Sequence, residues 1–386
     1  TNSGGRTCHA AIVSRELGVP CIVGTTNATE KIKTGEMITI NCADGEVGFV
    51  YQGYFNFKQR KIDLKKLPQT HTKIMFNLAE PARAFEFSFL PNDGVGLARE
   101  EFIVNNYIKI HPAALWNFDK LKDQKVKNQI GTMTVGYQHK TDFFVDKLAE
   151  GIAMIAAAFY PKDVIVRLSD FKTNEYANLI GGKSFEPVEE NPMIGWRGAA
   201  RYYDPKFIDI FKLECQALKR VRDDMGLTNV KVMIPFVRTL EEAKKVIAIM
   251  STCGLRRHQN GLELYMMVEI PSNVILAEKF AKLFDGFSIG SNDLTQLTLG
   301  LDRDSGILTH IGNEKNEAVK ELISAAIKVA NKTKTKIGIC GQAPSDFPDF
   351  AQFLVQAGID SISLNPDSVV KTKTAIAAME KKIKRS

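Results

Sequence analysis

Hydrophobic residues gather in short runs along most of this chain, and the runs alternate with longer amphipathic stretches. Beyond residue 72, eight runs have the length and composition of β-strands: Lys73–Leu78, Gly94–Leu97, Val164–Leu168, Val230–Phe236, Leu264–Val268, Gly286–Ile289, Lys336–Cys340 and Ser361–Leu364. Stretches with helical spacing lie between them, such as Leu240–Met250, Glu317–Asn331 and Phe347–Ala357. Strands that alternate with helices in this number predict an α/β fold, a (β/α)8 TIM barrel.

The first 52 residues follow a different pattern, rich in glycine and threonine. Their expected elements are one helix and three strands, at His9–Leu17, Pro20–Gly24, Met37–Asn41 and Val47–Tyr51. These elements are too few to close a core, and the chain starts at Thr1 within a motif. We therefore expect 1–52 to be a truncated small α/β domain, 53–72 a polar linker and 73–386 the barrel.

Composition is that of a globular protein, with 44% hydrophobic and 25% charged residues. The apolar stretch Ile152–Phe159 is too short to span a membrane and is expected as a buried helix. Six cysteines are scattered without a CxxC pair or a zinc-type spacing, which favours a reduced, cytoplasmic protein. The net charge of +7 suits an anionic small substrate, and no nucleic-acid-binding signature accompanies it.

A glycine-rich loop opens the first expected helix, where Gly4 and Gly5 precede Thr7-Cys8-His9. Glycines let a backbone approach a ligand closely, and the N-terminus of a helix favours phosphate. A neutral imidazole can attack a phosphoryl group and pass it on. An isolated histidine would ordinarily carry no such role, but the residues around His9 favour a phosphoryl carrier.

A second set of chemical residues follows the expected barrel strands at their C-terminal ends. It comprises two arginines, two carboxylates, an amide and a thiol: Arg99, Arg167, Glu269, Asp293, Asn292 and Cys340. Barrels place active sites at this face, so we expect these side chains to meet. Two carboxylates can hold Mg²⁺, arginines clamp phosphate or carboxylate, and a thiol can exchange a proton with carbon. Each residue alone could be a solvated strand end, but the full set at one rim favours a site.

Two further arginines lie outside the strand ends. Arg197 belongs to the long segment Glu189–Gly198, where it is either functional or a surface residue of a lid. Arg303 follows the sixth strand shortly afterwards, in Leu301-Asp302-Arg303-Asp304.

Taken together, seven motifs resemble the phosphoenolpyruvate-utilising enzyme superfamily: TCHAAIVSREL, DGVGLAREEF, RLSDFKTNEYANLIGG, EENPMIGWRGAARYY, VEIPSN, FSIGSNDLTQLTLGLDRDSG and ICGQAPSD. They stand in order over nearly the whole chain, and look closest to the phosphoenolpyruvate synthase family. Such enzymes couple an ATP-binding domain, a swivelling phosphohistidine domain and a pyruvate-binding barrel. They convert ATP, pyruvate and water to AMP, phosphate and phosphoenolpyruvate. The resemblance implies Mg²⁺, or Mn²⁺ in its place, and a homodimer formed through the barrel.

The resemblance also assigns roles by position. It implies that His9 is the phosphohistidine, that Cys340 donates the proton to the enolate, and that Glu269 and Asp293 are the metal ligands. It further implies substrate-binding residues and one regulatory site: Arg99, Arg167 and Arg303 for phosphate and carboxylate, Gly290, Ser291 and Asn292 for the substrate turn, and Thr7 for a regulatory kinase.

Two departures from the family pattern stand out. The ATP-binding domain and the front half of the phosphohistidine domain are missing, so we expect a C-terminal fragment. Ala343 stands where the family pattern GQGPSD has its second glycine.

Two other enzymes remain open, pyruvate phosphate dikinase and the first enzyme of the phosphotransferase system. They share the barrel chemistry and differ in what phosphorylates the histidine or what it phosphorylates. Thr7-Cys8-His9 and GQAPSD favour the synthase, because a serine is expected before the histidine in the others. A non-catalytic barrel scaffold is the alternative from another class, and such a scaffold need not bring these residues together.

Overall fold

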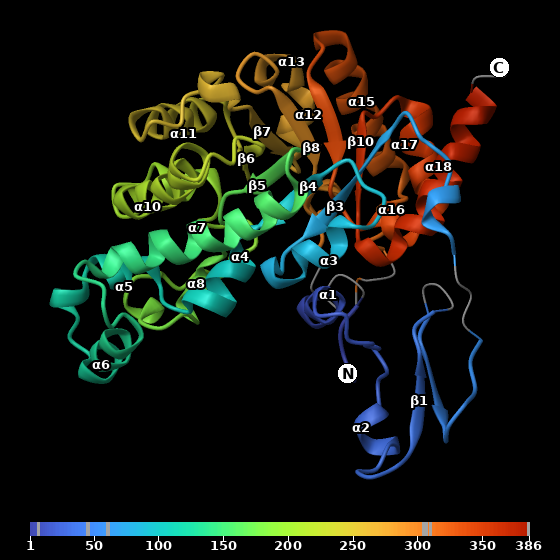
Figure 1. Ribbon diagram of the computed structural model, residues 1–386, viewed down its shortest axis with the longest axis horizontal. Coiled ribbons are helices and arrows are strands. Elements are labelled where there is room, and N and C mark those ends of the chain that lie inside the picture. Colours follow the sequence, from blue (N-terminus) through green and yellow to red (C-terminus); the bar gives the residue numbers. More distant parts are fainter. Residues whose placement is uncertain (6–7, 44–46, 59–61, 303–307, 309–310, 384–386) are drawn as a thin grey trace.

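The computed structural model describes residues 1–5, 8–43, 47–58, 62–302, 308 and 311–383. Two of the predicted site residues, Thr7 and Arg303, lie outside the described residues. A large barrel with a shell of helices makes up most of the molecule, and a small N-terminal region with its own two-stranded sheet lies beside one end of it (Figure 1).

In the described part of the chain, eight parallel strands form one closed barrel: β3 (Lys73–Leu78), β4 (Val95–Arg99), β5 (Val164–Arg167), β6 (Val230–Ile234), β7 (Leu264–Val268), β8 (Gly286–Ile289), β9 (Lys336–Ile339) and β10 (Ser361–Leu364). The barrel closes because β10 pairs in parallel with both β3 and β9. Strands between a filled interior and a helical shell are buried on both faces, which explains their apolar runs. The predicted TIM barrel is confirmed.

Helices surround the strands (Figure 1). Those of the barrel region are α3 (Ala84–Ser88), α4 (Glu100–Ile103), α5 (Pro112–Trp116), α6 (Gln124–Met133), α7 (Lys140–Phe159), α8 (Thr173–Ala177), α9 (Ala199–Tyr202), α10 (Ile208–Lys219), α11 (Leu240–Thr252), α12 (Pro271–Ile275), α13 (Ala277–Phe280), α14 (Ser291–Leu299), α15 (Glu317–Thr333), α16 (Ala343–Asp346), α17 (Pro348–Ala357) and α18 (Val369–Ile383). The predicted buried helix is the C-terminal part of α7. No helix among the described residues is both long and apolar enough to cross a membrane.

Aspartates fix the N-terminal ends of several barrel strands. Asp93, Asp285 and Asp360 each stand just before a strand, and each carboxylate accepts the backbone N–H of a residue on the preceding strand, at 2.8 Å from Ile74, Leu264 and Ile337. A buried backbone donor without a partner would be costly, so these contacts secure the strand ends. They mark the rim opposite the one where the predicted site residues lie.

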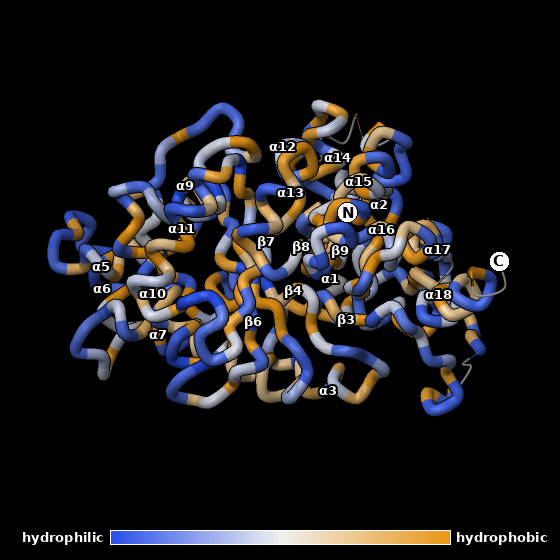
Figure 2. The backbone as a smooth tube through the Cα atoms, turned by 90° about the horizontal axis from the view of Figure 1, so that it is seen from above, coloured by the Kyte–Doolittle hydropathy of each residue, from blue (hydrophilic) through white to orange (hydrophobic). Residues whose placement is uncertain are grey.

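One layer of side chains fills the middle of the barrel. It is a buried cluster separate from the shell core: Met75, Leu97, Ile165, Met233, Tyr265, Met267 and Cys340. Figure 2 shows hydrophobic positions concentrated along the strands and hydrophilic ones in the outer loops. This layer divides the interior into an upper and a lower part.

The N-terminal region holds α1 (His9–Glu16), α2 (Ala28–Lys31), β1 (Ile38–Asn41) and β2 (Phe49–Gln52), with β1 and β2 antiparallel. The predicted strand at Pro20–Gly24 is wrong. Its backbone joins residues 1–3 by isolated contacts, such as Thr1 N to Ile22 O at 2.6 Å, and not by a ladder. Pro20 has no N–H to give, and no described strand lies alongside to pair with this segment.

Candidate active site

The C-terminal ends of the strands surround a pocket of 190 Å³. Most of the predicted site residues line it: His9, Arg99, Arg167, Glu269, Gly290, Asn292, Asp293 and Cys340. His9 and Ile12 come from α1, so the N-terminal region contributes to a pocket that the barrel otherwise forms. The expectation that these side chains meet at one rim is fulfilled in the described chain.

Arg99 and Arg167 end two adjacent strands and are register partners. Arg167 donates to Glu101 at 3.0 Å and lies 3.5 Å from an oxygen of Asp170. Burial alone would lower the pKa of Arg167, but the carboxylates of Glu101, Asp170 and Glu269 outweigh it and raise the pKa above its ordinary value. The arginine therefore stays charged and is held in place at the pocket wall.

Arg197, whose role the sequence left open, also lines the pocket. It is only 2% exposed and holds Asp170 through two hydrogen bonds of 2.9 and 2.6 Å, with a third contact to Asp293 at 3.4 Å. Its guanidinium also lies 4.1 Å from the centre of the Phe236 ring. A surface arginine of a lid is excluded, because this side chain is buried at the base of the pocket.

The backbone around Arg197 is shaped to bring it there. Gly198 has a φ of +57°, and a Cβ at that position would lie 2.6 Å from the Cβ of Phe236. Only glycine accepts that conformation and that close approach without strain. Asp170, the partner of Arg197, comes shortly after β5, with Leu168 and Ser169 between it and the last strand residue Arg167. A carboxylate so close to a strand end was the sequence signal for it.

Glu269 and Asp293 form the acidic part of the pocket. Glu269 is fully buried, and its Oε1 accepts the backbone N–H of Phe236 at 2.7 Å. Burial first, then the neighbouring carboxylates Asp293 and Asp170, raise the pKa of Glu269 to about 8 despite two arginines. Like charges held this close favour either a proton or a cation between them.

The acidic residues fit a divalent cation. Glu269 Oε2 is buried and accepts no hydrogen bond from the described residues. Gly290 leaves the space beside this oxygen open, since a Cβ there would lie 2.7 Å from it. Among the described residues no group of three or more histidine, cysteine or acidic side chains is arranged to hold a metal. Two carboxylates with water and substrate oxygens are nevertheless a set that Mg²⁺ accepts.

Cys340 lies at the floor of the pocket, in the central side-chain layer. It is 3% exposed, and its Sγ lies 3.6 Å from the carbonyl oxygen of Ile289. Burial raises the pKa of this thiol, although a hydrogen bond with Ser288 and the charge of Arg167 pull it the other way. The thiol is thus in its protonated form at neutral pH, which suits a proton donor.

Ser291 is the one described residue of the predicted set that does not line the pocket. It is fully buried, and its hydroxyl donates to Glu314. Gly341 permits this packing, because a Cβ at 341 would collide with the Ser291 hydroxyl. Its side chain therefore anchors the start of α14, next to Asn292 and Asp293, which do face the pocket.

Comparison with known proteins decides the family. The family described as PEP-utilising enzyme, PEP-binding domain, matches residues 56–381, and the family described as PEP-utilising enzyme, mobile domain, matches residues 1–45. This chain belongs to the PEP-utilising enzymes. Within the family, its resemblance to the phosphoenolpyruvate synthases extends along the whole chain.

Two relatives show how far this similarity reaches. The phosphoenolpyruvate synthase of Synechocystis sp. is 61% identical over 382 residues, which are 99% of this chain and 47% of the relative. That of Escherichia coli is 56% identical over 381 residues, 99% of this chain and 48% of the relative. The chain thus spans about half the length of the curated relatives it matches.

A solved structure of malate synthase from Haloferax volcanii, in complex with lead(II), shares 10% of its sequence with this chain. The matched region covers 80% of this chain and 74% of the malate synthase chain, with a TM-score of 0.43. This likeness adds nothing to the functional argument.

Proposed function

We propose that this chain carries the phosphohistidine and the pyruvate half-reaction of a phosphoenolpyruvate synthase. In the complete reaction ATP, pyruvate and water give AMP, phosphate and phosphoenolpyruvate, with the phosphoryl group resting on a histidine in between. The observation that carries the proposal is the single pocket that His9 lines together with Arg99, Arg167, Glu269, Asp293 and Cys340. The chain-wide similarity to synthases supports it.

His9 and the arginines would move the phosphoryl group. In the direction from phosphoenolpyruvate, the bond from phosphorus to the enolate oxygen breaks while a bond from phosphorus to a ring nitrogen of His9 forms. Arg99 and Arg167 would neutralise the oxygens of the moving group, and Arg303 is proposed as a third donor from the family pattern. Arg197 would hold Asp170 and Asp293 in position from the base of the pocket.

Glu269 and Asp293 would hold Mg²⁺, with Mn²⁺ able to replace it. When bound, the cation would polarise the pyruvate ketone and acidify its methyl group. Gly290 and Asn292 line the same wall and would take the substrate, with Ser291 fixing their helix.

Cys340 would move the proton. The carbon of the enolate, left when the phosphoryl group departs, takes a proton from the Cys340 thiol to give the methyl group of pyruvate. In the direction of synthesis the thiolate removes it again. The high pKa of the thiol favours donation at neutral pH.

The remaining partners are proposed from the family alone. ATP would act through a domain present in the longer relatives, the barrel would form a homodimer, and Thr7 would be the target of a regulatory kinase. A cytoplasmic location fits the reduced cysteines of the described chain.

The test is transfer of labelled phosphate from phosphoenolpyruvate to the chain in the presence of Mg²⁺. We expect an acid-labile label on His9 that pyruvate chases back into phosphoenolpyruvate. His9→Ala should take up no label, whereas His139→Ala, an exposed histidine away from the pocket, should label like the parent. No label on the parent, or equal label on His9→Ala, would overturn the proposal.

A further inference from the structure

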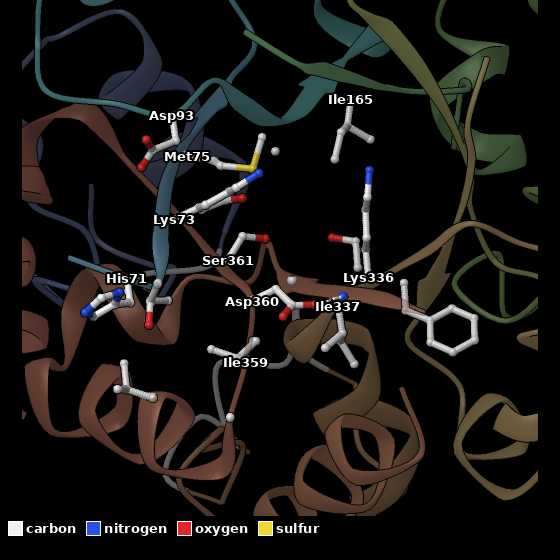
Figure 3. A pocket seen from close by; sticks show the side chains of 18 of the residues that line it. His71, Lys73, Met75, Asp93, Ile165, Lys336, Ile337, Ile359, Asp360 and Ser361 are labelled. Atoms are coloured by element: carbon white, nitrogen blue, oxygen red, sulfur yellow. Dashed lines mark hydrogen bonds between the residues drawn. The ribbon is translucent and has the colours of Figure 1, made fainter. Parts of the chain in front are cut away.

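A second cavity opens at the opposite, N-terminal end of the barrel, which we call the lower cavity. Its volume is 630 Å³, against 190 Å³ for the candidate active site. The first residues of several strands line it, and Figure 3 shows Lys73 and Lys336 reaching into it from two walls, with Ser361 between them.

The lower cavity exists because several side chains that β8, β9 and β10 direct into the barrel interior are small. Barrel interiors are usually packed with bulky branched side chains. On β8, β9 and β10, however, four of the lining residues are small, namely Ser288, Gly338, Ser361 and Ser363, beside the larger Phe287, Lys336 and Ile337. A Cβ on Gly338 would lie 2.3 Å from the Ser361 hydroxyl, so alanine there would force that hydroxyl to turn away. The sequence therefore keeps this half of the interior open.

The central cluster of buried side chains lies between the lower cavity and the candidate active site. Met75, Ile165 and Tyr265 line the lower cavity, while Leu97, Met267 and Cys340 line the active-site pocket. All six belong to the one buried cluster in the middle of the barrel. A molecule in the lower cavity would thus contact the same buried cluster that contains Cys340.

Three polar groups in the lower cavity have no hydrogen-bond or ion-pair partner among the described residues. Ser363 is 3% exposed, yet neither its hydroxyl nor that of Ser361 makes a hydrogen bond with a described residue. The Lys73 ammonium likewise forms no ion pair with a described residue. Lys73 faces Ser361 in the register of β3 and β10, and Met75 faces Ser363. The two strands therefore present a cation and a hydroxyl side by side, with a second hydroxyl deeper in.

The other charges at the mouth are already engaged. Asp93 and Asp360 each accept a backbone N–H at 2.8 Å, and Lys336 pairs with Glu263 at 2.7 Å. These carboxylates would repel a phosphate or a dicarboxylate, while one carboxylate could still reach Lys73. Beyond Lys73, the side chains of Met75, Ile165 and Tyr265 supply apolar surface beside the Ser363 hydroxyl. The chemistry thus selects a ligand with one negative charge and an apolar body.

We propose that the lower cavity is a second binding site, for a small amphipathic monocarboxylate. The carboxylate of this ligand pairs with the Lys73 ammonium and accepts a hydrogen bond from the Ser361 hydroxyl. Its apolar body lies against Met75, Ile165 and Tyr265. This site is independent of the phosphoryl chemistry proposed above.

The test uses the whole chain labelled with ¹³C in its methionine methyl groups, and 3-phenylpropionate as the probe. Met75 reports on the lower cavity and Met267 on the active-site pocket. We expect a saturable shift of the Met75 signal. Lys73→Gln should weaken binding by about 10-fold, since a hydrogen-bonded charge contact is lost. Lys371→Gln, an exposed lysine outside the cavity, should change nothing.

Two further arms make the result decisive. The neutral analogue 3-phenylpropan-1-ol should bind the parent more weakly than the acid, and equally in the parent and Lys73→Gln. Ser363→Leu should fill the hollow and remove the Met75 shift; if that variant does not fold, Lys73→Gln still decides. A Met75 signal that does not move, a shift confined to Met267, or unchanged affinity in Lys73→Gln would overturn the proposal.

Discussion

Arg99 and Arg167 are register partners on the adjacent strands β4 and β5, so two positively charged side chains stand next to each other at the rim of the barrel. Like charges on neighbouring strands repel each other unless anionic groups lie close by. Glu101 and Asp170 supply part of that compensation at Arg167, at 3.0 and 3.5 Å. An anionic substrate between the two arginines, as proposed above, would supply more.

The first prediction concerns Arg167→Lys. Lysine keeps the charge but loses the planar fork that can hold Glu101 and a substrate oxygen together. We expect affinity for oxalate, measured by calorimetry with Mg²⁺ present, to fall by about 10-fold, in line with one lost charged hydrogen bond. Arg220→Lys is the matched control, because Arg220 is a partly exposed residue paired with Asp146 far from the pocket. Oxalate affinity equal to that of the parent would remove Arg167 from the substrate site.

The second prediction concerns the metal. The two carboxylates of Glu269 and Asp293 lie close enough for Asp293 to raise the pKa of Glu269, and Glu269 Oε2 has no hydrogen bond within the described chain. We expect Mn²⁺ to bind and to bind more tightly with oxalate, a mimic of the pyruvate enolate. In Asp293→Asn that gain should collapse, with Mn²⁺ affinity down by about 10-fold or more, as the charge that attracts it is lost. Calorimetry and the paramagnetic signal of Mn²⁺ both report it.

The control for the metal prediction is Glu150→Gln, which removes one negative charge from the exposed side of α7. It should leave Mn²⁺ affinity unchanged, so that a loss in Asp293→Asn cannot be a matter of net charge. Should oxalate still tighten Mn²⁺ binding to Asp293→Asn as in the parent, Asp293 is not a ligand.

The third prediction concerns pH and stability. Glu214 is fully buried beside Glu100 and accepts the Ser169 hydroxyl at 2.5 Å. Burial raises its pKa to about 7, from an ordinary value of 4.5. The folded protein therefore holds this proton more tightly than the unfolded chain. The contribution of Glu214 to the free energy of unfolding is therefore fully present below about pH 4.5. It is lost as the pH rises towards and through 7.

Thermal unfolding at pH 6 and pH 8 tests this expectation. The parent should be less stable at pH 8, by on the order of 1–3 kcal/mol from these carboxyls. Glu214→Gln cannot ionise and should reduce the difference, leaving the part due to Glu100, while Glu321→Gln on the exposed face of α15 should keep all of it. A parent whose melting temperature is the same at both pH values would show that Glu214 and Glu100 are not held protonated.

Sequence patterns were sufficient for the barrel because its strands are buried on both faces. The bounds of β3, β7, β8 and β10 are those expected from the apolar runs alone. Pro20–Gly24 has a similar apolar character and yet is no strand, since a strand needs a partner and composition does not reveal whether one is present. Local pattern thus fixes where a strand can form, and pairing decides whether it does.

Sequence also predicted that most of the candidate site residues would meet at one rim, but not how they hold one another. Arg167, Glu269 and Cys340 stand at the C-terminal ends of barrel strands. In a parallel barrel these ends meet at one rim, so the predicted fold alone brings the three residues together. The bonds from Arg197 to Asp170 join residues 27 positions apart, and the Ser291 hydroxyl reaches Glu314 across 23. Such contacts depend on how loops fold back over the barrel, and no periodicity records that.

The last prediction separates proton transfer from phosphoryl transfer and concerns Cys340. If its thiol is the acid–base group, this chain should exchange the methyl protons of Mg²⁺-bound pyruvate with solvent. That reaction needs neither ATP nor a phosphohistidine. Because burial raises the pKa of the thiol, the thiolate fraction grows through the neutral range, and the exchange rate should rise with pH there without levelling off.

Loss of the pyruvate methyl signal in D₂O, followed by NMR, measures this exchange in three samples. The parent and His9→Ala should exchange alike, since His9 has no part in moving the proton. Cys340→Ser nearly preserves the volume of a side chain that is 3% exposed, so packing should survive. A hydroxyl has a far higher pKa than a thiol near 8.5, and the rate should fall on the order of 10²-fold or more. Equal rates in the parent and Cys340→Ser would mean that the thiol only packs in the central layer and that another base moves the proton.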